Sequence, residues 1–155
     1  SGAVGISIAH FIKCNAELLD ISEKSLDTAR KNADYNGVCA KFTQCDILND
    51  MPGGKYDIIV SNPPYIESDV IPTLDVNVRC YEPHRALDGG SDGLVFYRRI
   101  CAISPKLLKG GGMLAFEVGY DQAEAVGELM KNDFEDICII PDLCGVDRVV
   151  TGIKK

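Results

Sequence analysis

The feature that most constrains the fold of this chain is a short apolar run that ends at two consecutive prolines. Residues 56–61 read Tyr-Asp-Ile-Ile-Val-Ser, and they lead directly into Asn62-Pro63-Pro64-Tyr65. A β-branched run bounded by turn-forming residues is typical of a buried parallel strand. Two prolines fix two φ angles and remove two backbone donors, so the strand must stop there. The carbonyls of Asn62 and Pro63 are then left to accept hydrogen bonds from a stiff turn.

Helical and extended patterns alternate along the rest of the chain. Helices are predicted over residues 4–11, from a cap at Ser22 to a stop at Asn36-Gly37, and over residues 94–104 and 122–131. Strands are predicted over residues 17–21, 40–44, 56–61, 113–118, 137–140 and 148–153. Residues 67–93 are expected to be irregular, and residues 109–112 to form a tight turn. This alternation predicts an α/β fold with a mostly parallel sheet flanked by helices.

Composition limits the class of protein. A chain of 155 residues with 46% hydrophobic content can bury one core, so one domain over residues 1–155 is expected. There is no apolar window of about eighteen residues and no charged-then-apolar leader, so we expect a cytoplasmic protein without a membrane partner. The net charge of −7 argues against a basic face that grips nucleic acid.

Seven cysteines are scattered along the chain without a Cys-x-x-Cys pair. This spacing argues against a structural zinc site and against a disulfide framework. We expect most of the cysteines to be buried small hydrophobes, and we expect no metal.

The turn after the 56–61 strand presents groups that could activate a planar amide or exocyclic amine toward a methyl sulfonium. An amide nitrogen is a weak nucleophile because its lone pair is delocalised. If its two N–H groups donate to the Asn62 side-chain oxygen and to the Pro63 carbonyl, the nitrogen faces the methyl donor and its developing positive charge is stabilised. Tyr65 and Pro64 would wall the amide. The alternative is that Asn-Pro-Pro-Tyr is only a surface turn or a proline-rich ligand motif, and the preceding apolar strand disfavours that alternative.

Residues 57–66, Asp-x-x-x-Ser-Asn-Pro-Pro-Tyr-Ile, resemble the catalytic segment of the glutamine methyltransferases that modify peptide-chain release factors, the HemK/PrmC family. The segment 82–94, Glu-Pro-His-Arg-Ala-Leu-Asp-Gly-Gly-Ser-Asp-Gly-Leu, resembles the same family, as do residues 111–119 and 142–149. Asn-Pro-Pro-Tyr is shared with adenine-amino DNA methyltransferases, whereas the 82–94 segment is more specific to the glutamine branch. The resemblance covers essentially the whole chain.

This resemblance implies a Rossmann-like class I methyltransferase with an antiparallel last strand and S-adenosylmethionine as its cofactor. Asp20 closes a predicted strand about eighteen residues beyond Gly2, where a doubly wound sheet offers a carboxylate to ribose hydroxyls. Capping the following helix is the alternative role of Asp20. Asp46 resembles the acid beside the adenine, and an ordinary loop acid is its alternative. The cofactor-binding residues implied are Gly2, Asp20, Ile21, Asp46, Ile47 and Asn62.

The resemblance also implies a substrate and a missing beginning. The substrate is the glutamine of the Gly-Gly-Gln loop in class-1 release factors. Family members start this domain with a strand and a glycine-rich turn, Asp-x-Gly-x-Gly-Ser-Gly, and Ser1-Gly2 falls inside that turn, so we expect that strand and an amino-terminal helical domain to be absent from this chain. Two alternatives remain open, an adenine-amino nucleic-acid methyltransferase and a non-catalytic fragment or adaptor.

Overall fold

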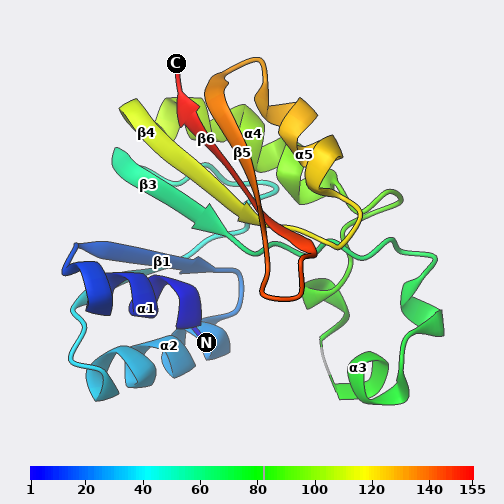
Figure 1. Cartoon of the computed structure of the whole chain (residues 1–155). Coiled ribbons are helices and arrows are strands. Elements are labelled where there is room, and N and C mark those ends of the chain that lie inside the picture. Colours follow the sequence, from blue (N-terminus) through cyan, green and yellow to red (C-terminus); the bar gives the residue numbers. More distant parts are fainter. Residues whose placement is uncertain (82) are drawn as a thin grey trace. The chain divides into compact units, whose positions relative to one another are not determined.

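The computed structural model describes residues 1–81 and 83–155 (Figure 1). The chain divides into two compact units, an amino-terminal unit of residues 1–52 and a carboxy-terminal unit of residues 53–155. Both units combine strands with helices, which confirms the predicted α/β class. Glu82, which opens the 82–94 segment, lies outside the described residues. One domain over residues 1–155 stays a prediction.

The amino-terminal unit is a two-stranded parallel sheet with two helices packed on it. Its sheet pairs Leu18 with Phe42 and ends with Asp20 opposite Gln44. Helix and strand share one core, built from Ile6, Leu18, Ala29 and Ala33. The elements, in chain order, are α1 (Ala3–Ile12), β1 (Ala16–Asp20), α2 (Glu23–Tyr35) and β2 (Ala40–Gln44). All four occur where the sequence predicts them, within a few residues.

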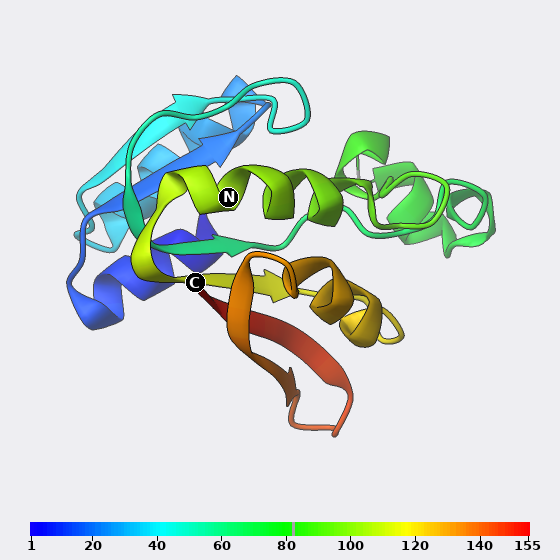
Figure 2. The same ribbon diagram turned by 90° about the horizontal axis from the view of Figure 1, so that it is seen from above.

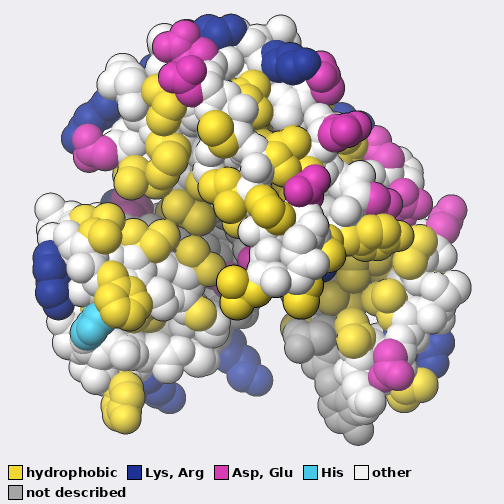
Figure 3. Space-filling view, viewed as in Figure 1, with side chains coloured by type: hydrophobic (Ala, Val, Ile, Leu, Met, Phe, Trp, Pro, Cys, Tyr) yellow, Lys and Arg dark blue, Asp and Glu magenta, His cyan; other side chains and the backbone are white. Residues whose placement is uncertain are grey.

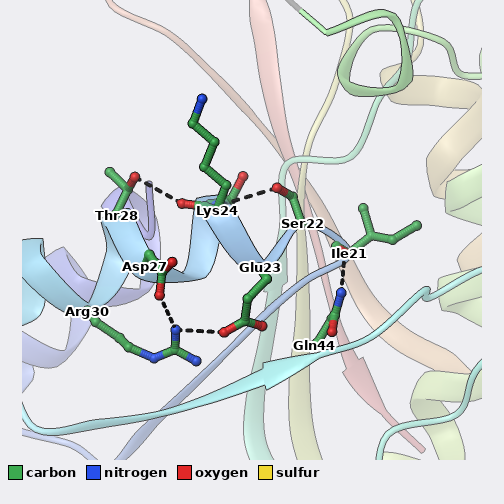
Figure 4. Close-up of polar contacts among 9 residues, drawn as sticks. Ile21, Ser22, Glu23, Lys24, Asp27, Thr28, Arg30 and Gln44 are labelled. Carbon is green, nitrogen blue, oxygen red and sulfur yellow. Dashed lines mark hydrogen bonds and ion pairs between the residues drawn. The ribbon is translucent and has the colours of Figure 1, made fainter.

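The predicted cap of α2 is present. The side chain of Ser22 accepts a hydrogen bond from the backbone N–H of Ser25 over 3.3 Å, which satisfies one of the free donors of the first helical turn. Along the helix, Arg30 contacts Glu23 and Asp27 (Figure 4). The Arg30 Cζ also lies 5.5 Å from the ring centroid of Phe42. Arg30, on the charged face of α2, therefore contacts β2 in addition to the apolar contacts that α2 makes with the sheet.

The carboxy-terminal unit is built on a four-stranded sheet with the order β3-β4-β6-β5. Strand β3 runs parallel to β4, and β6 runs antiparallel to both β4 and β5, which confirms the expected antiparallel last strand. Helix α4 lies along one side of β3 and β4 when seen from above (Figure 2), and it also contacts α5. The bounds are β3 (Tyr56–Ser61), α4 (Val95–Leu107), β4 (Leu108–Glu117), α5 (Ala123–Met130), β5 (Phe134–Pro141) and β6 (Asp147–Lys154).

The core under α4 is aromatic at its centre. The ring of Tyr97 meets the ring of Phe116 edge-on, with centroids 5.2 Å apart, and both side chains are fully buried. The Tyr97 hydroxyl donates to the carbonyl of Glu117 over 2.9 Å, so its polar tip is satisfied. Burial raises the pKa of Tyr97 well above its ordinary value. Among the helices that the structure describes, none is both long and apolar enough to cross a membrane.

The prediction of an irregular stretch over residues 67–93 is wrong in part. This stretch holds the short helices η1 (Ile71–Thr73), α3 (Val76–Tyr81) and η2 (His84–Ala86). Helix α3 begins because the Asp75 carboxylate accepts from the backbone N–H of Asn77 over 2.8 Å, and η1 has a proline in its first turn. Helices this short span too little of a helical period to be detected as amphipathic.

The prediction of a tight turn at residues 109–112 is also wrong. These residues belong to β4, in which Leu108 pairs with Tyr56 and Met113 pairs with Ile58. Four residues of β4, 109–112, therefore lie opposite one residue of β3, Asp57, and the glycines form an irregularity inside the strand rather than its boundary. Gly111 takes a φ of 71° there, a conformation that glycine adopts without steric strain.

The cysteines also depart from expectation. Of the six described as free thiols, only Cys45 and Cys101 are buried, so the prediction that most are buried is wrong. Burial raises the pKa of the Cys101 thiol to about 12, and this cysteine fits the small-hydrophobe role. The four exposed thiols are Cys14, Cys39, Cys138 and Cys144.

Candidate active site

The turn at residues 62–65 leaves β3 at its carboxyl end. Ser61, the last residue of β3, pairs with Phe116 of β4. The Asn62 side chain is exposed, whereas Pro63 is buried. Within the described part of the chain, no protein donor bonds the side-chain oxygen of Asn62 or the carbonyl of Pro63. Neither oxygen is therefore committed to a donor of the described protein.

Gln122 holds the other end of this turn. Its Nε2 donates to the carbonyl of Tyr65 over 3.0 Å, and its Oε1 accepts from the backbone N–H of Gly119 over 3.1 Å. Gln122 was not among the residues that the sequence singled out for the site. Its position at the start of a predicted helix, three residues after a strand-ending glycine, was the signal available, because such polar side chains often bond backbone groups near a helix start.

Three glycines leave room for Tyr65 and for the Gln122 amide. A Cβ on Gly89 would come within 2.8 Å of the Tyr65 Cα, and one on Gly119 within 3.4 Å of the Tyr65 ring. A Cβ on Gly93 would overlap with the Tyr65 carbonyl oxygen and the Gln122 nitrogen. Since Gly89 and Gly93 come from the 82–94 segment, residues 89–93 of that segment pack directly beside the turn.

A short backbone bridge joins the turn to the 82–94 segment. The N–H of Ile66 donates to the carbonyl of Leu87 over 3.0 Å, and the N–H of Gly89 donates to the carbonyl of Ile66 over 2.8 Å. The Ser68 hydroxyl adds a bond to Asp88 over 2.7 Å. Hydrogen bonds from Ser68 and from the Gly90 N–H lower the pKa of Asp88 below its usual value.

The carboxyl edge of the two-stranded sheet brings Asp20, Ile21 and Asp46 together in the amino-terminal unit. Asp20 and Gln44 end their strands opposite each other, and Gln44 Nε2 donates to the carbonyl of Ile21 over 3.0 Å (Figure 4). Asp20 Oδ1 accepts from the backbone N–H of Ser22 over 2.9 Å, so it does support the start of α2. In the described residues, its second oxygen has no protein partner.

Asp46 is more committed to its own loop. Its Oδ1 accepts from the N–H of Leu48 over 3.1 Å, and its Oδ2 accepts from the side chain of Asn49 over 2.8 Å. Both oxygens thus serve the loop after β2, which favours the structural alternative for this acid. Its neighbour Ile47 is half-buried at the same edge.

Gly2 takes a left-handed conformation, with a φ of 73°, at the start of α1. A Cβ there would come within 2.6 Å of Leu18 and 2.9 Å of Ala29. The helix start therefore lies close against β1 and α2, and only glycine fits. Among the described residues no side chain caps this helix end, so its first N–H groups are open to an acceptor.

An ion pair holds the loop of the carboxy-terminal hairpin. Arg148 Nε lies 3.5 Å from Asp142 Oδ2, so Arg148 anchors the β5–β6 loop. Arg148 also donates to the carbonyl of Val118 over 3.2 Å, which links this loop to the end of β4. On the face shown in Figure 3, Lys and Arg side chains are scattered in small groups rather than gathered in one band.

Solved structures place this fold among the methyltransferases. The chain superposes on the methyltransferase from Pyrococcus furiosus with a TM-score of 0.75 at 19% identity, covering 99% of this chain and 70% of that one. It also matches the N-methyltransferase NodS from Bradyrhizobium japonicum, solved with S-adenosyl-L-homocysteine, with a TM-score of 0.54 at 14% identity, over 89% of this chain and 65% of that one. These likenesses define the fold, a class I methyltransferase fold, and confirm the predicted fold class.

Sequence comparison gives the family. The family model of the methyltransferase small domain matches residues 1–79, and the chain belongs to this family. It is 43% identical to the release factor glutamine methyltransferase of Clostridium acetobutylicum and 40% identical to that of Clostridium botulinum, over 99% of this chain in both cases. It covers 56% of each, so the chain spans about half the length of the curated relatives it matches. The predicted resemblance is confirmed.

Proposed function

We propose that this chain is the catalytic domain of an S-adenosylmethionine-dependent methyltransferase that acts on the side-chain amide of a protein glutamine. The glutamine of the Gly-Gly-Gln loop in a class-1 release factor is the proposed substrate. The names of the relatives support this assignment, and the acidic net charge of −7 favours a protein substrate over nucleic acid.

One observation carries the proposal. Asn62 and Pro63 present two oxygens that no donor of the described protein engages, on a turn held at both of its ends. A primary amide has two N–H donors on one nitrogen, so two acceptors can fix that nitrogen and the direction it faces.

The chain's own residues would act by orientation and charge stabilisation. S-adenosylmethionine, when bound, supplies a methyl group carried on a positively charged sulfur. The Asn62 side-chain oxygen and the Pro63 carbonyl hold the two N–H groups and stabilise positive charge that develops on the nitrogen. Pro64 and Tyr65 wall the planar amide. The proton leaves the methylated nitrogen for water, so no side-chain base is required.

The amino-terminal unit offers groups that fit the cofactor. The free oxygen of Asp20 can accept from ribose hydroxyls, and Ile21 and Ile47 offer apolar contact at the same sheet edge. The backbone N–H groups at the start of α1, next to Gly2, can donate to the carboxylate of the methionine end. Asp46 holds its loop through both oxygens, so we propose a supporting role for it beside the adenine.

Mass spectrometry of a release factor tests this function. The protein in its full natural length is incubated with S-adenosylmethionine and a class-1 release factor, and the Gly-Gly-Gln peptide is analysed. We expect one added methyl on the glutamine, lost in Asn62→Ala but retained in Asn132→Ala, which removes an exposed amide beyond the far end of α5.

Three other results would contradict the proposal. Equal methylation by Asn62→Ala would remove the role of Asn62. Methylation of adenine in DNA, with an unmodified release factor, would favour the nucleic-acid enzyme. Absence of S-adenosylmethionine binding by calorimetry would favour a non-catalytic adaptor.

A further inference from the structure

We infer that Gln122 is a positioning residue, which sets the orientation of the turn at residues 62–65 without touching the substrate. This inference rests on the proposed function. The side chain of Gln122 is half-buried at the start of α5 and bonds two backbone groups from different parts of the unit. One is the carbonyl of Tyr65, 3.0 Å away, and the other is the N–H of Gly119, 3.1 Å away.

Residues 116–119 hold both ends of the turn at residues 62–65. Upstream of Asn62, Ser61 pairs with Phe116 in the β3–β4 ladder. Downstream, the Tyr65 carbonyl is bonded through Gln122 to Gly119, three residues beyond Phe116. The two prolines between these anchors have φ fixed by their rings. With both ends fixed and the middle stiff, the two acceptor oxygens have little freedom.

The backbone around Gln122 restricts the position of its side-chain amide. A Cβ on Gly93 would overlap with the Gln122 nitrogen, and a Cβ on Gly119 would lie 2.8 Å from Gln122 Oε1. Two neighbouring backbones therefore approach the amide closely, and side chains are excluded there. A side chain packed this closely fixes the distance between Tyr65 and the end of β4, so the turn cannot shift independently of β4.

The chemistry of the two contacts requires an amide. The Tyr65 carbonyl needs a donor, and the Gly119 N–H needs an acceptor, so one side chain must supply both. A carboxylate can accept from Gly119 but cannot donate to Tyr65, and two oxygens would then repel each other. A protonated carboxylic acid could supply both roles. The bridge in a Gln122→Glu variant should therefore depend on pH, whereas the native bridge should not.

Kinetics on the full-length protein test the inference. Gln122→Met keeps the length of the side chain and removes both hydrogen bonds. A small misplacement of the acceptor oxygens should lower kcat by about 10- to 100-fold. The Kd for S-adenosylmethionine, measured by calorimetry, should stay within about twofold, because the cofactor residues proposed here lie mainly in the amino-terminal unit. An unchanged kcat, or equal losses in kcat and cofactor affinity, would overturn the positioning role.

The pH profile of Gln122→Glu separates this role from a general effect on folding. Burial and the facing carbonyl raise the pKa of the introduced acid, so its deficit relative to wild type should be larger at about pH 8 than at about pH 5.5. The titratable groups around position 122 are Tyr65, whose carbonyl bonds the side chain, and the exposed Asp121 and Glu124, which flank it. Asn132→Asp is the matched control, since it adds the same charge beyond the other end of α5, about 12 Å along the helix. A pH-independent deficit would overturn the inference.

Hydrogen exchange keeps the two proposals distinguishable. If the wild-type protein methylates the release factor and the Gln122 variants match it, the positioning role fails while the proposed function stands. If the wild-type protein does not methylate, the proposed function fails, and the bridge is judged by exchange of the Tyr65 and Ile66 amides. Faster exchange in Gln122→Met than in Asn132→Ala supports the bridge, and equal exchange overturns it.

Discussion

The hydroxyl of Ser68 donates a hydrogen bond to Oδ1 of Asp88 over 2.7 Å. The same carboxylate oxygen accepts from the N–H of Gly90 over 2.9 Å, so it accepts hydrogen bonds from two separate loop segments. Gly89 lies between Asp88 and Gly90 in the chain, and its own N–H donates to the carbonyl of Ile66. The Ser68–Asp88 bond therefore lies next to the backbone bridge that holds Ile66. The loop and the turn at residues 62–65 are therefore expected to lose order together.

Ser68→Ala should destabilise the protein by about 1 kcal/mol, the value typical of one partly exposed hydrogen bond to a charged group. Urea unfolding measures this difference. Thr73→Val is a suitable control, because its exposed hydroxyl bonds only the nearby Val70 carbonyl. A loss in Ser68→Ala no greater than in the control would contradict a role for this bond in holding the loop.

The effect of Ser68→Ala should depend on pH. The pKa of Asp88 is lowered in the folded protein, with the Ser68 bond as its largest cause. A lowered folded pKa means that the stabilisation is present above the unfolded value and is lost as the pH falls through the folded pKa. The stability gap between wild type and Ser68→Ala should thus be larger at about pH 5.5 than at about pH 3. A gap that grows on acidification would contradict this assignment.

Gly89→Ala should be among the most damaging small substitutions in the carboxy-terminal unit. The added Cβ would lie 2.8 Å from the Tyr65 Cα and 2.9 Å from Gly93, and both obstacles are backbone. We expect a loss of about 2 kcal/mol or more, because the loop must move away from the turn. Gly111→Ala serves as the comparison, since Gly111 has a φ of 71° but nothing within 4 Å of its Cβ.

Gly111→Ala should cost only the strain of a left-handed residue, about 1 kcal/mol. Methylation kinetics add a second readout. Gly89→Ala should lower kcat in the molecules that remain folded, and Gly111→Ala should not. If both substitutions behave alike, close packing around Tyr65 is not what the glycine at position 89 provides.

Asp20→Asn separates the two roles considered for this acid. An asparagine can still accept from the Ser22 N–H, so the start of α2 and the stability of the protein should be retained. It cannot offer two anionic oxygens to a ribose, and loss of a charged hydrogen bond should weaken S-adenosylmethionine binding by about tenfold or more. Calorimetry measures this change. Unchanged affinity would leave Asp20 with only its capping role.

The sequence predicts best where one residue type dictates the local backbone. Pro63 and Pro64 end β3, Ser22 starts α2, and both predictions hold because each acts within a few residues of itself. The proposal that Asn62 and Pro63 supply the two acceptors rests on the same local chemistry. The antiparallel direction of β6 came from the resemblance, whereas its position between β4 and β5 was not predicted, since strand order depends on distant pairing.

What the sequence could not supply depends on contacts between distant residues. The bond from Gln122 to Tyr65 joins residues 57 positions apart, and no local pattern encodes it. The glycines near Gly111 look like a turn but lie in a strand, because pairing with β3 decides their conformation. Asp46 looks like a free acid until its bonds to Leu48 and Asn49 are known.

Lys154 should contribute more to stability than its place near the chain end suggests. Its Nζ donates to the carbonyls of Pro105 and Leu108 over 2.6 Å and 3.0 Å, at the carboxyl end of α4. Pro105 lies in the last turn of α4, where carbonyls lack helical partners, and a cation there also opposes the negative end of the helix dipole. Lys154→Met keeps the apolar stem and should lower the free energy of unfolding by about 1–2 kcal/mol.

Lys155→Met is the matched control, because the exposed Lys155 bonds the carbonyls of Lys131 and Asn132 and should matter by less than about 0.5 kcal/mol. Urea unfolding of both variants decides the point, and equal losses would mean that burial of the lysine contributes nothing.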